Sequence, residues 1–181
     1  MGTVLKRWLS RGLSIFGGLL LAASAAGAGE QTTSVQTEYM MSIYLPSEAH
    51  VVGNGLTIIN HPGGRIEGQR INGKIVPPSG DWLRIANGVV RLDVRLTVRA
   101  DDNEIIYISY NGVFQCEKEV FEKFLKGQLL RANDCYFITA PTFQTKSERY
   151  SWLNSVQAVG KMVEIKAGDD AHLIYDIFMI K

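Results

Sequence analysis

Hydrophobic and polar residues alternate through much of the chain after residue 37, which predicts a protein built from β-strands. The clearest run is Leu92–Arg99, in which Leu or Val at every second position alternates with acidic, basic and Thr residues. Ile106–Tyr110 repeats the pattern after Asp101-Asp102-Asn103, residue types that favour a tight turn. Met162–Ala167 and Leu173–Ile180 form a second pair of runs across a short Gly-Asp-Asp segment. Connections this short predict antiparallel hairpins.

Four further apolar runs complete the expected sheet. They span residues 38–45, 56–60, 66–76 and 134–140. The pair Pro77-Pro78 is expected to end the third run, because proline cannot donate a hydrogen bond to a neighbouring strand. About eight antiparallel strands in roughly 150 residues predict a closed barrel or a sandwich. The alternation alone does not distinguish these two folds.

One segment has the apolar spacing of a helix rather than a strand. Residues 117–130 place apolar side chains three and four positions apart. Gly127 either ends this helix early or is tolerated within it at a cost in stability. A short helix inserted between strands is expected to form a lid or plug at one mouth of the barrel.

The first 28 residues have the three parts of a secretory signal peptide. Lys6, Arg7 and Arg11 supply the positive start, and Gly12–Ala23 is apolar apart from one Ser. Ala26-Gly27-Ala28 then provides small residues for cleavage. The apolar run is shorter than the roughly 20 residues that a membrane-spanning helix needs. The alternative is an uncleaved N-terminal anchor.

Cleavage after Ala28 divides the chain into a signal peptide (1–28), a disordered lead-in (29–37) and a single β-barrel domain (38–181). It removes three basic residues and no acids, so that 19 Lys+Arg and 18 Asp+Glu become 16 and 18. This nearly neutral balance lacks the basic footprint of a nucleic-acid-binding protein. We therefore expect an exported protein, periplasmic or secreted, with no nucleic-acid partner and no stable membrane span after cleavage.

Cys116 and Cys135 are the two cysteines of the chain. An oxidising compartment permits a disulfide between them. The bridge would close a loop of about 20 residues, for which the chain-entropy model gives roughly 3 kcal/mol of stabilisation. The alternative is two buried thiols, because the sequence does not give the distance between the two Cα atoms.

Five short segments in a fixed order carry a family resemblance. They are Gly63–Gly68, Gly73–Trp82, Leu92–Arg95, Pro141–Thr145 and Tyr150–Asn154. Together they resemble the family known as domain of unknown function 3237, over about residues 40–180. This family is similar to the allene oxide cyclase and dirigent barrels, whose cavities bind apolar or phenolic molecules.

The resemblance implies an all-β fold: a single antiparallel β-barrel of about eight strands with one short helix inserted near residues 117–130. A barrel of eight strands can hold one small ligand in its interior. Self-association into a homo-oligomer is expected only by analogy with that group of barrels. The chain departs from the family pattern where Ile138 replaces an arginine and Gln144 replaces a glutamate. A glutamine cannot take up a proton, which disfavours acid–base catalysis at that position.

The sequence carries none of the common catalytic signatures. It has no metal-binding spacing of His and Cys, no phosphate-binding glycine loop and no nucleophile elbow, so we expect no cofactor. The three histidines, His50, His61 and His172, are isolated in sequence. Each is expected on the surface or in a loop.

The candidate catalytic residues are polar groups within or beside apolar strands. Asp81 or Glu67 would act as the general base, and Arg65 or Arg95 would stabilise an enolate-like charge. The neighbouring ring of Trp82 and burial would raise the pKa of Asp81. The alternative is that Asp81 caps a turn through its own backbone while Trp82 packs.

Candidate ligand-binding residues are mostly aromatic. Asp93 and Arg95 share one face of their strand, and would form either a structural ion pair or an anchor for a ligand oxygen. Tyr150 and Trp152 would line a pocket, or would instead pack one end of the barrel while Asn154 pins a loop. The full set is Trp82, Asp93, Phe143, Tyr150, Trp152 and Asn154.

These observations support a barrel that binds a small apolar or aromatic molecule and isomerises, cyclises or cleaves it. The alternative is a non-catalytic periplasmic module that binds a ligand, or a partner protein through an exposed strand edge. The absence of a recognisable catalytic constellation favours this alternative.

Overall fold

Strands dominate the part of the chain that the structure describes. The computed structural model describes residues 34–181, so the predicted signal peptide and most of the predicted lead-in lie outside the described residues. The strands are β1 (Thr37–Pro46), β2 (Glu48–Gly53), β3 (Leu56–Asn60), β4 (Arg65–Glu67), β5 (Asn72–Ala86), β6 (Val89–Ala100), β7 (Ile105–Gln115), β8 (Leu130–Arg131), β9 (Tyr136–Thr145), β10 (Ala158–Lys166) and β11 (His172–Ile180). The helices are α1 (Lys118–Leu125) and the 3₁₀ helix η1 (Ser151–Ser155).

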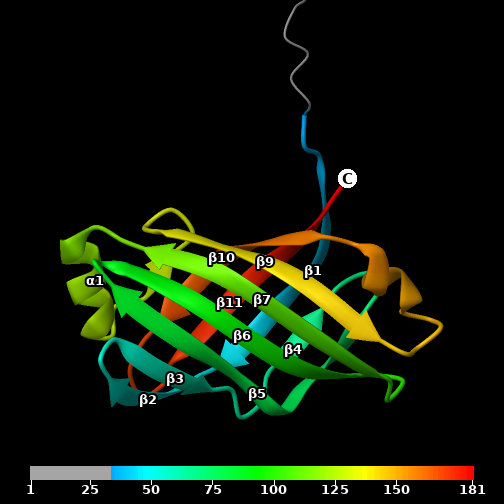
Figure 1. Ribbon diagram of the computed structural model, residues 1–181, viewed down its shortest axis with the longest axis horizontal. Coiled ribbons are helices and arrows are strands. Elements are labelled where there is room, and N and C mark those ends of the chain that lie inside the picture. The colour runs from blue at the N-terminus through cyan, green and yellow to red at the C-terminus, as the bar shows by residue number, and fades with distance from the viewer. Residues whose placement is uncertain (1–33) are drawn as a thin grey trace, which may run out of the picture. The chain divides into compact units, whose positions relative to one another are not determined.

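The sheet closes into a barrel (Figure 1). Strands pair in the order β4-β1-β11-β10-β9-β7-β6, and β5 pairs with both β6 and β4, which completes a ring of eight. Every pairing is antiparallel. The predicted eight-stranded antiparallel barrel is therefore confirmed, and the sandwich is excluded.

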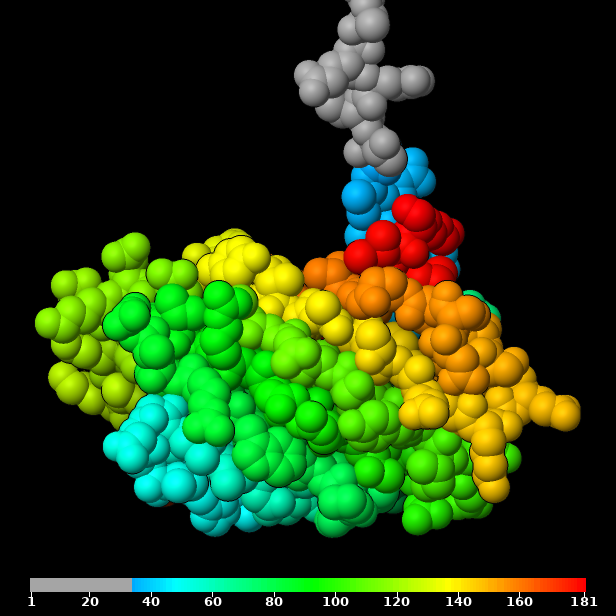
Figure 2. Space-filling view, in the orientation of Figure 1, coloured from blue at the N-terminus to red at the C-terminus, as the bar shows by residue number. Residues whose placement is uncertain are grey.

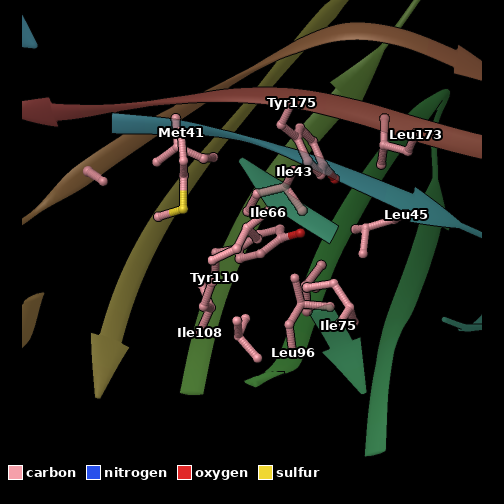
Figure 3. Packing of buried hydrophobic residues seen from close by; sticks show 14 of the residues in the cluster. Met41, Ile43, Leu45, Ile66, Ile75, Leu96, Ile108, Tyr110, Leu173 and Tyr175 are labelled. Atoms are coloured by element: carbon pink, nitrogen blue, oxygen red, sulfur yellow. The ribbon is translucent and has the colours of Figure 1, made fainter. Parts of the chain in front are cut away.

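The alternation read from the sequence explains which side chains fill the barrel. In β6, Leu92, Val94, Leu96 and Val98 are buried, whereas the residues between them are exposed or half-buried. Figure 3 shows side chains from several strands meeting in the interior, among them Met41, Ile43 and Tyr175. Burial of this apolar face contributes roughly 1.5–3 kcal/mol for each large side chain.

Strands β1 and β2 are two consecutive stretches of one course of the chain along the sheet, and β3 and β4 are two stretches of a second, antiparallel course. Each course loses its strand conformation at one point, and the two points lie side by side. β1 pairs with β4 and β2 pairs with β3, while β3 and β4 both lie along β5. The interruptions fall at Ser47 and at residues 61–64, and we call them together the paired break. Gly64 has a φ of +133°, a conformation that residues with a side chain rarely adopt.

Two expectations about this region are wrong. The run 66–76 is not one strand, because β4 ends at Glu67 and β5 begins at Asn72. Pro77-Pro78 does not end a strand either: both prolines are exposed within β5, where the register with β6 shifts between Val76 and Gly80. Such an irregularity accommodates residues that cannot donate to the ladder.

The predicted helix exists but is shorter than expected. α1 ends at Leu125, and Gly127 follows with a φ of +88°, so the glycine ends the helix early. Phe121 and Phe124 pack against Phe114 of β7, with ring centroids 6.0 and 5.7 Å apart. Figure 1 shows α1 at one end of the barrel and η1 at the other. No helix within residues 34–181 has the length and apolarity to cross a membrane.

A disulfide joins Cys116 and Cys135, whose Cα atoms lie 4.6 Å apart. Cys116 comes just before α1, and Cys135 comes just before β9. The bond therefore ties together the two ends of the segment that carries α1, and the alternative of two free thiols is excluded.

We expect the double variant Cys116→Ala/Cys135→Ala to lose stability. The bridge spans 19 positions, so its removal should lower the free energy of unfolding by roughly 3 kcal/mol. Urea unfolding of the oxidised wild type and the variant measures the difference, with reduced wild type as the control. Unfolding of all three at the same urea concentration would show that the bond does not stabilise the fold.

Candidate functional site

A cavity of about 550 Å³ lies at the end of the barrel that carries α1. Residues from α1, the β2–β3 hairpin, strands β5, β6, β7 and β9 and the β10–β11 turn line it. Figure 2 shows α1 and the β2–β3 hairpin at the same end of the molecule. The volume lies within the range of roughly 300–1,000 Å³ typical of small-molecule sites.

Aromatic side chains form one wall of the cavity and continue below it. Phe114 stacks on Phe137 with ring centroids 4.8 Å apart. Phe137 meets the edge of Tyr175 at 5.5 Å, and Tyr175 in turn meets Tyr110 at 5.9 Å. An unbroken run of rings thus connects α1 with the centre of the barrel.

Asp81 of β5 brings a carboxyl group into this apolar surface. It lines the cavity and is only 4% exposed. One carboxyl oxygen accepts a hydrogen bond of 3.0 Å from the backbone N–H of Asp93 on β6. Burial disfavours the charged form and raises the pKa of Asp81 to about 7, although the hydrogen bond from Asp93 opposes the shift.

Of the two causes expected from the sequence, burial raises the pKa of Asp81 and the ring of Trp82 does not. Trp82 is 39% exposed and follows Asp81 on a strand whose successive side chains alternate between the two faces, and its ring lies beside Arg95 on the outside. Desolvation inside the barrel raises the pKa of Asp81, whereas the backbone N–H of Trp82 lowers it. The turn-capping alternative for Asp81 does not hold, because the residue lies within β5 and its carboxyl bonds to a neighbouring strand.

His61 is a second buried polar group of the cavity, and it lies in a loop as expected. This loop is the segment between β3 and β4, and the residue is 3% exposed and lines the cavity. Its Nδ1 lies 3.1 Å from the carbonyl oxygen of Pro46 and 3.4 Å from Ser47 Oγ, across the paired break. Burial lowers the pKa of His61, so the imidazole is neutral at pH 7.

The strand register places His61 beside Asp81. Ile59 of β3 lies opposite Asp81, and the backbone N–H of His61 continues the ladder with a 3.1 Å hydrogen bond to the carbonyl oxygen of Ser79. His61 is therefore the diagonal neighbour of Asp81 on the same inner face, a relation that typically separates Cα atoms by roughly 7–8 Å.

Two polar groups nearer the mouth, His172 and Lys166, are already paired. His172 also lines the cavity, but its Nδ1 lies 2.8 Å from the carbonyl oxygen of Asp170 and its Nε2 lies 3.2 Å from Glu164. Lys166 forms an ion pair of 2.6 Å with Asp170. His50, the third histidine, lies exposed on β2.

Two tyrosine hydroxyls are buried below the cavity. Tyr110 lies in the same row as Asp81, because Val94 pairs with both residues. The hydroxyls of Tyr110 and Tyr175 have no hydrogen-bond partner among residues 34–181. Burial, with the nearby charge of Asp81 as a smaller cause, raises the pKa of both, so both remain protonated. Figure 3 shows the two rings in the interior close to Ile43 and Leu45.

The other predicted catalytic residues lie outside the barrel. Arg65 and Glu67 form an exposed ion pair of 2.8 Å on β4. Asp93 and Arg95 form one of 2.6 Å on β6, as the structural interpretation of that pair expected. None of these four side chains lines the cavity.

The remaining predicted ligand-binding residues lie away from the cavity. Phe143 is buried on β9, and Tyr150 is buried next to η1. Trp152 packs under Arg70, whose guanidinium carbon is 3.7 Å from the ring centroid. Asn154 bonds to both the N–H and the carbonyl of Thr145, at 2.8 and 2.9 Å, and so pins a loop.

Ile138 and Gln144, where the chain departs from the family pattern, both lie on β9 with side chains that are not buried. Neither lines the cavity, so the two substitutions do not change its surface.

Sequence reasoning found Asp81 but missed His61 and the phenylalanines around the cavity. A signal for His61 was present: Thr57, Ile59 and His61 are spaced by two, and all three line the cavity. For Phe121 and Phe124, the sequence indicated that the helix has an apolar face, but it did not indicate that this face covers the cavity.

The fold and the cavity define a closed β-barrel with a capped, mostly apolar pocket. The family model described as protein of unknown function, DUF3237, matches residues 34–180, and the chain belongs to this family. A UPF0311 protein of Clostridium acetobutylicum is 35% identical over 91 residues. The match covers 50% of this chain and 58% of that relative, so the chain spans less than two thirds of its length.

Two solved structures share the fold. The crystal structure of a conserved protein of unknown function from Rhodopseudomonas palustris gives a TM-score of 0.75 at 24% identity, covering 83% of this chain and 99% of that chain. A β-barrel-like protein from Acinetobacter baumannii gives a TM-score of 0.66 at 25% identity, covering 84% and 99%.

The raised pKa of Asp81 makes stability depend on pH. The unfolded carboxyl ionises at about 3.9, whereas the folded group keeps its proton up to about pH 7. Between these values the folded state binds more protons, so the free energy of unfolding falls as pH rises and levels off above about 7. Asp81→Asn removes this decline, and we expect the variant to gain roughly 1–4 kcal/mol relative to wild type between pH 4 and pH 8.

Urea unfolding across this pH range measures the difference between the two proteins. The opposite contribution of His61 is common to both and cancels in the comparison. Asp102→Asn is the matched control, because it makes the same change at an aspartate that pairs with Arg149 and does not line the cavity. Parallel pH profiles for wild type and Asp81→Asn would contradict the raised pKa.

Proposed function

We propose that this protein binds a small apolar or aromatic molecule in the cavity and that Asp81 transfers a proton to or from it. The observation that carries the proposal is a buried carboxyl group with a pKa of about 7 on the wall of an apolar cavity. The reaction class that fits is isomerisation, cyclisation or lyase-type cleavage, each of which needs a proton moved at one carbon or oxygen.

The acid–base role of Asp81 follows because its pKa lies near neutral pH. A proton-transfer group works best when its pKa lies near the working pH, because both forms are then populated. Asp81 has one oxygen held by the Asp93 N–H, which fixes the direction of the carboxyl group. Positioned acids and bases of this kind contribute rate factors of about 10²–10⁴.

A second candidate function is ligand binding without chemistry. One observation favours it: the arginines expected to stabilise an enolate-like charge, Arg65 and Arg95, lie outside the barrel in exposed ion pairs. Among the residues that line the cavity, the cation is Lys166, which is already paired with Asp170. A carrier would hold its ligand in the same cavity and release it unchanged.

We also propose that the protein is exported to the periplasm or secreted. The proposal rests on the signal-peptide pattern of residues 1–28 and is supported by the Cys116–Cys135 bond, since disulfides persist in oxidising compartments. Self-association remains an expectation by analogy.

Recovery of the natural ligand tests the proposal. The protein is purified from its own host without reducing agent, weighed by native mass spectrometry, and extracted with solvent to identify a bound molecule. That molecule is then incubated with wild type, Asp81→Asn and the control Asp102→Asn. We expect turnover to fall at least about 100-fold in Asp81→Asn and to be unchanged in the control.

Each other outcome has a defined meaning. A ligand that wild type returns unchanged supports the carrier function. Equal turnover by wild type and Asp81→Asn would show that Asp81 is not the proton-transfer group. A protein that carries no ligand and gives no thermal shift with apolar and phenolic compounds would contradict ligand binding itself.

A further inference from the structure

His61 has one ring nitrogen that the fold uses and one that it does not. Nδ1 lies 3.1 Å from the carbonyl oxygen of Pro46. A carbonyl oxygen can only accept a hydrogen bond, so Nδ1 must carry the proton in the neutral ring. Nε2 is then the acceptor nitrogen, and it has no partner at hydrogen-bond distance within residues 34–181.

The position of His61 directs that acceptor toward the cavity. The residue is 3% exposed and lines the cavity, while its Nδ1 side faces the backbone at the paired break. The opposite side of the ring, which carries Nε2, is therefore the side available to a ligand. Nε2 is not among the polar atoms that are fully buried without a partner, so it remains accessible, and a ligand that donates to it gains a hydrogen bond.

The other polar side chains around the cavity differ from His61 because they are either engaged or exposed to solvent, as the carboxylates of Glu48 and Asp169 are. Both ring nitrogens of His172 are within hydrogen-bond distance of protein oxygens. Glu48 accepts a hydrogen bond of 2.8 Å from Asn60, and Lys166 is paired with Asp170. Asp81 has one oxygen engaged and lies diagonally next to His61.

We propose that His61 forms a hydroxyl-binding subsite in the cavity. Nε2 accepts a hydrogen bond from the O–H group of a neutral alcohol or phenol whose hydrocarbon body lies against Phe114, Phe121 and Phe137. The subsite rests on the proposed function of the cavity and narrows its ligand class to hydroxyl-bearing apolar molecules. It also places the ligand oxygen beside the carboxyl group of Asp81.

The chemistry of the cavity disfavours the competing ligand classes. A carboxylate or phosphate would meet the carboxyl group of Asp81 and an unprotonated imidazole nitrogen, with no unpaired cation among the described lining residues. A ketone or ether has no hydrogen to donate to Nε2, so it leaves that nitrogen without a partner even where protonated Asp81 donates to its oxygen. A hydrocarbon would leave Nε2 without a partner.

Three naphthalenes of similar shape test the proposal. 2-Naphthol donates a hydrogen bond, 2-methoxynaphthalene keeps the oxygen but has no O–H, and 2-methylnaphthalene lacks the oxygen. Binding to the oxidised protein is measured by calorimetry at one pH. We expect 2-naphthol to bind about tenfold more tightly than either of the other two, the effect of one net hydrogen bond.

A matched pair of variants then tests whether His61 is the residue that accepts the hydrogen bond from the naphthol O–H group. In His61→Asn the amide can still donate to the Pro46 carbonyl as Nδ1 does, but nothing takes the place of Nε2. We expect this variant to bind all three naphthalenes with equal affinity. His172→Asn, at a cavity-lining histidine whose nitrogens are both engaged, should keep the tenfold preference.

The outcomes separate this subsite from the proposed function. Equal binding of the three compounds to wild type would overturn the hydroxyl subsite while leaving an apolar ligand site intact. A preference for 2-naphthol that persists in His61→Asn would also overturn it. Failure of wild type to bind any of the three would contradict both proposals. The comparison in wild type needs no variant, so it remains decisive if His61→Asn does not fold.

Discussion

The paired break in the β1–β2 and β3–β4 courses is the constraint on which the rest of the structure depends. Below the break, β4 joins β1 to β5 and closes the ring. Above it, β3 still pairs with β5, but β2 pairs with β3 alone, so the β2–β3 hairpin forms one side of a cavity rather than part of a packed core. The hydrogen bond of His61 to Pro46 holds the two courses together where the ladder is interrupted. The open side of the cavity and the inward position of His61 follow from this break, whereas α1 is placed by its packing on Phe114 and by the disulfide.

The chemistry of the site arises from burying one carboxyl group in that cavity. An ionised carboxylate in apolar surroundings is costly, and the protein meets the cost by raising the pKa of Asp81 to about 7. The ion pairs of Arg65–Glu67 and Arg95–Asp93 stay on the exposed surface, where they are worth little in stability. The charged groups that looked most like a catalytic pair are therefore surface features, and the deeply buried titratable groups that line the cavity are Asp81 and the neutral His61.

The sequence predicted the barrel because strand periodicity is local. The alternation in β6 and the hairpins around β6–β7 and β10–β11 depend on neighbouring residues, and the structure reproduces them. The split of residues 66–76 into two strands and the continuation of β5 through Pro77-Pro78 depend on which strands pair with β5. The alternation of apolar and polar residues along one segment carries no information about its partner strands. Asp81 stood out in the sequence as an acidic residue between Gly80 and Trp82, just after the proline pair. His61 was missed because its burial depends on the paired break, a feature of two segments that are 14 residues apart in sequence.

The pKa of Asp81 is the most direct test of this account. Carbon-13 NMR of protein labelled at the aspartate side-chain carboxyl carbons follows each carboxyl group as pH changes, and the spectrum of Asp81→Asn assigns the resonance of Asp81. We expect that resonance to titrate with a midpoint near 7, because burial in the cavity holds the proton. A midpoint near 4, the ordinary value for a solvent-exposed aspartate, would contradict the account, because the cavity would then not hold the proton on Asp81 at neutral pH.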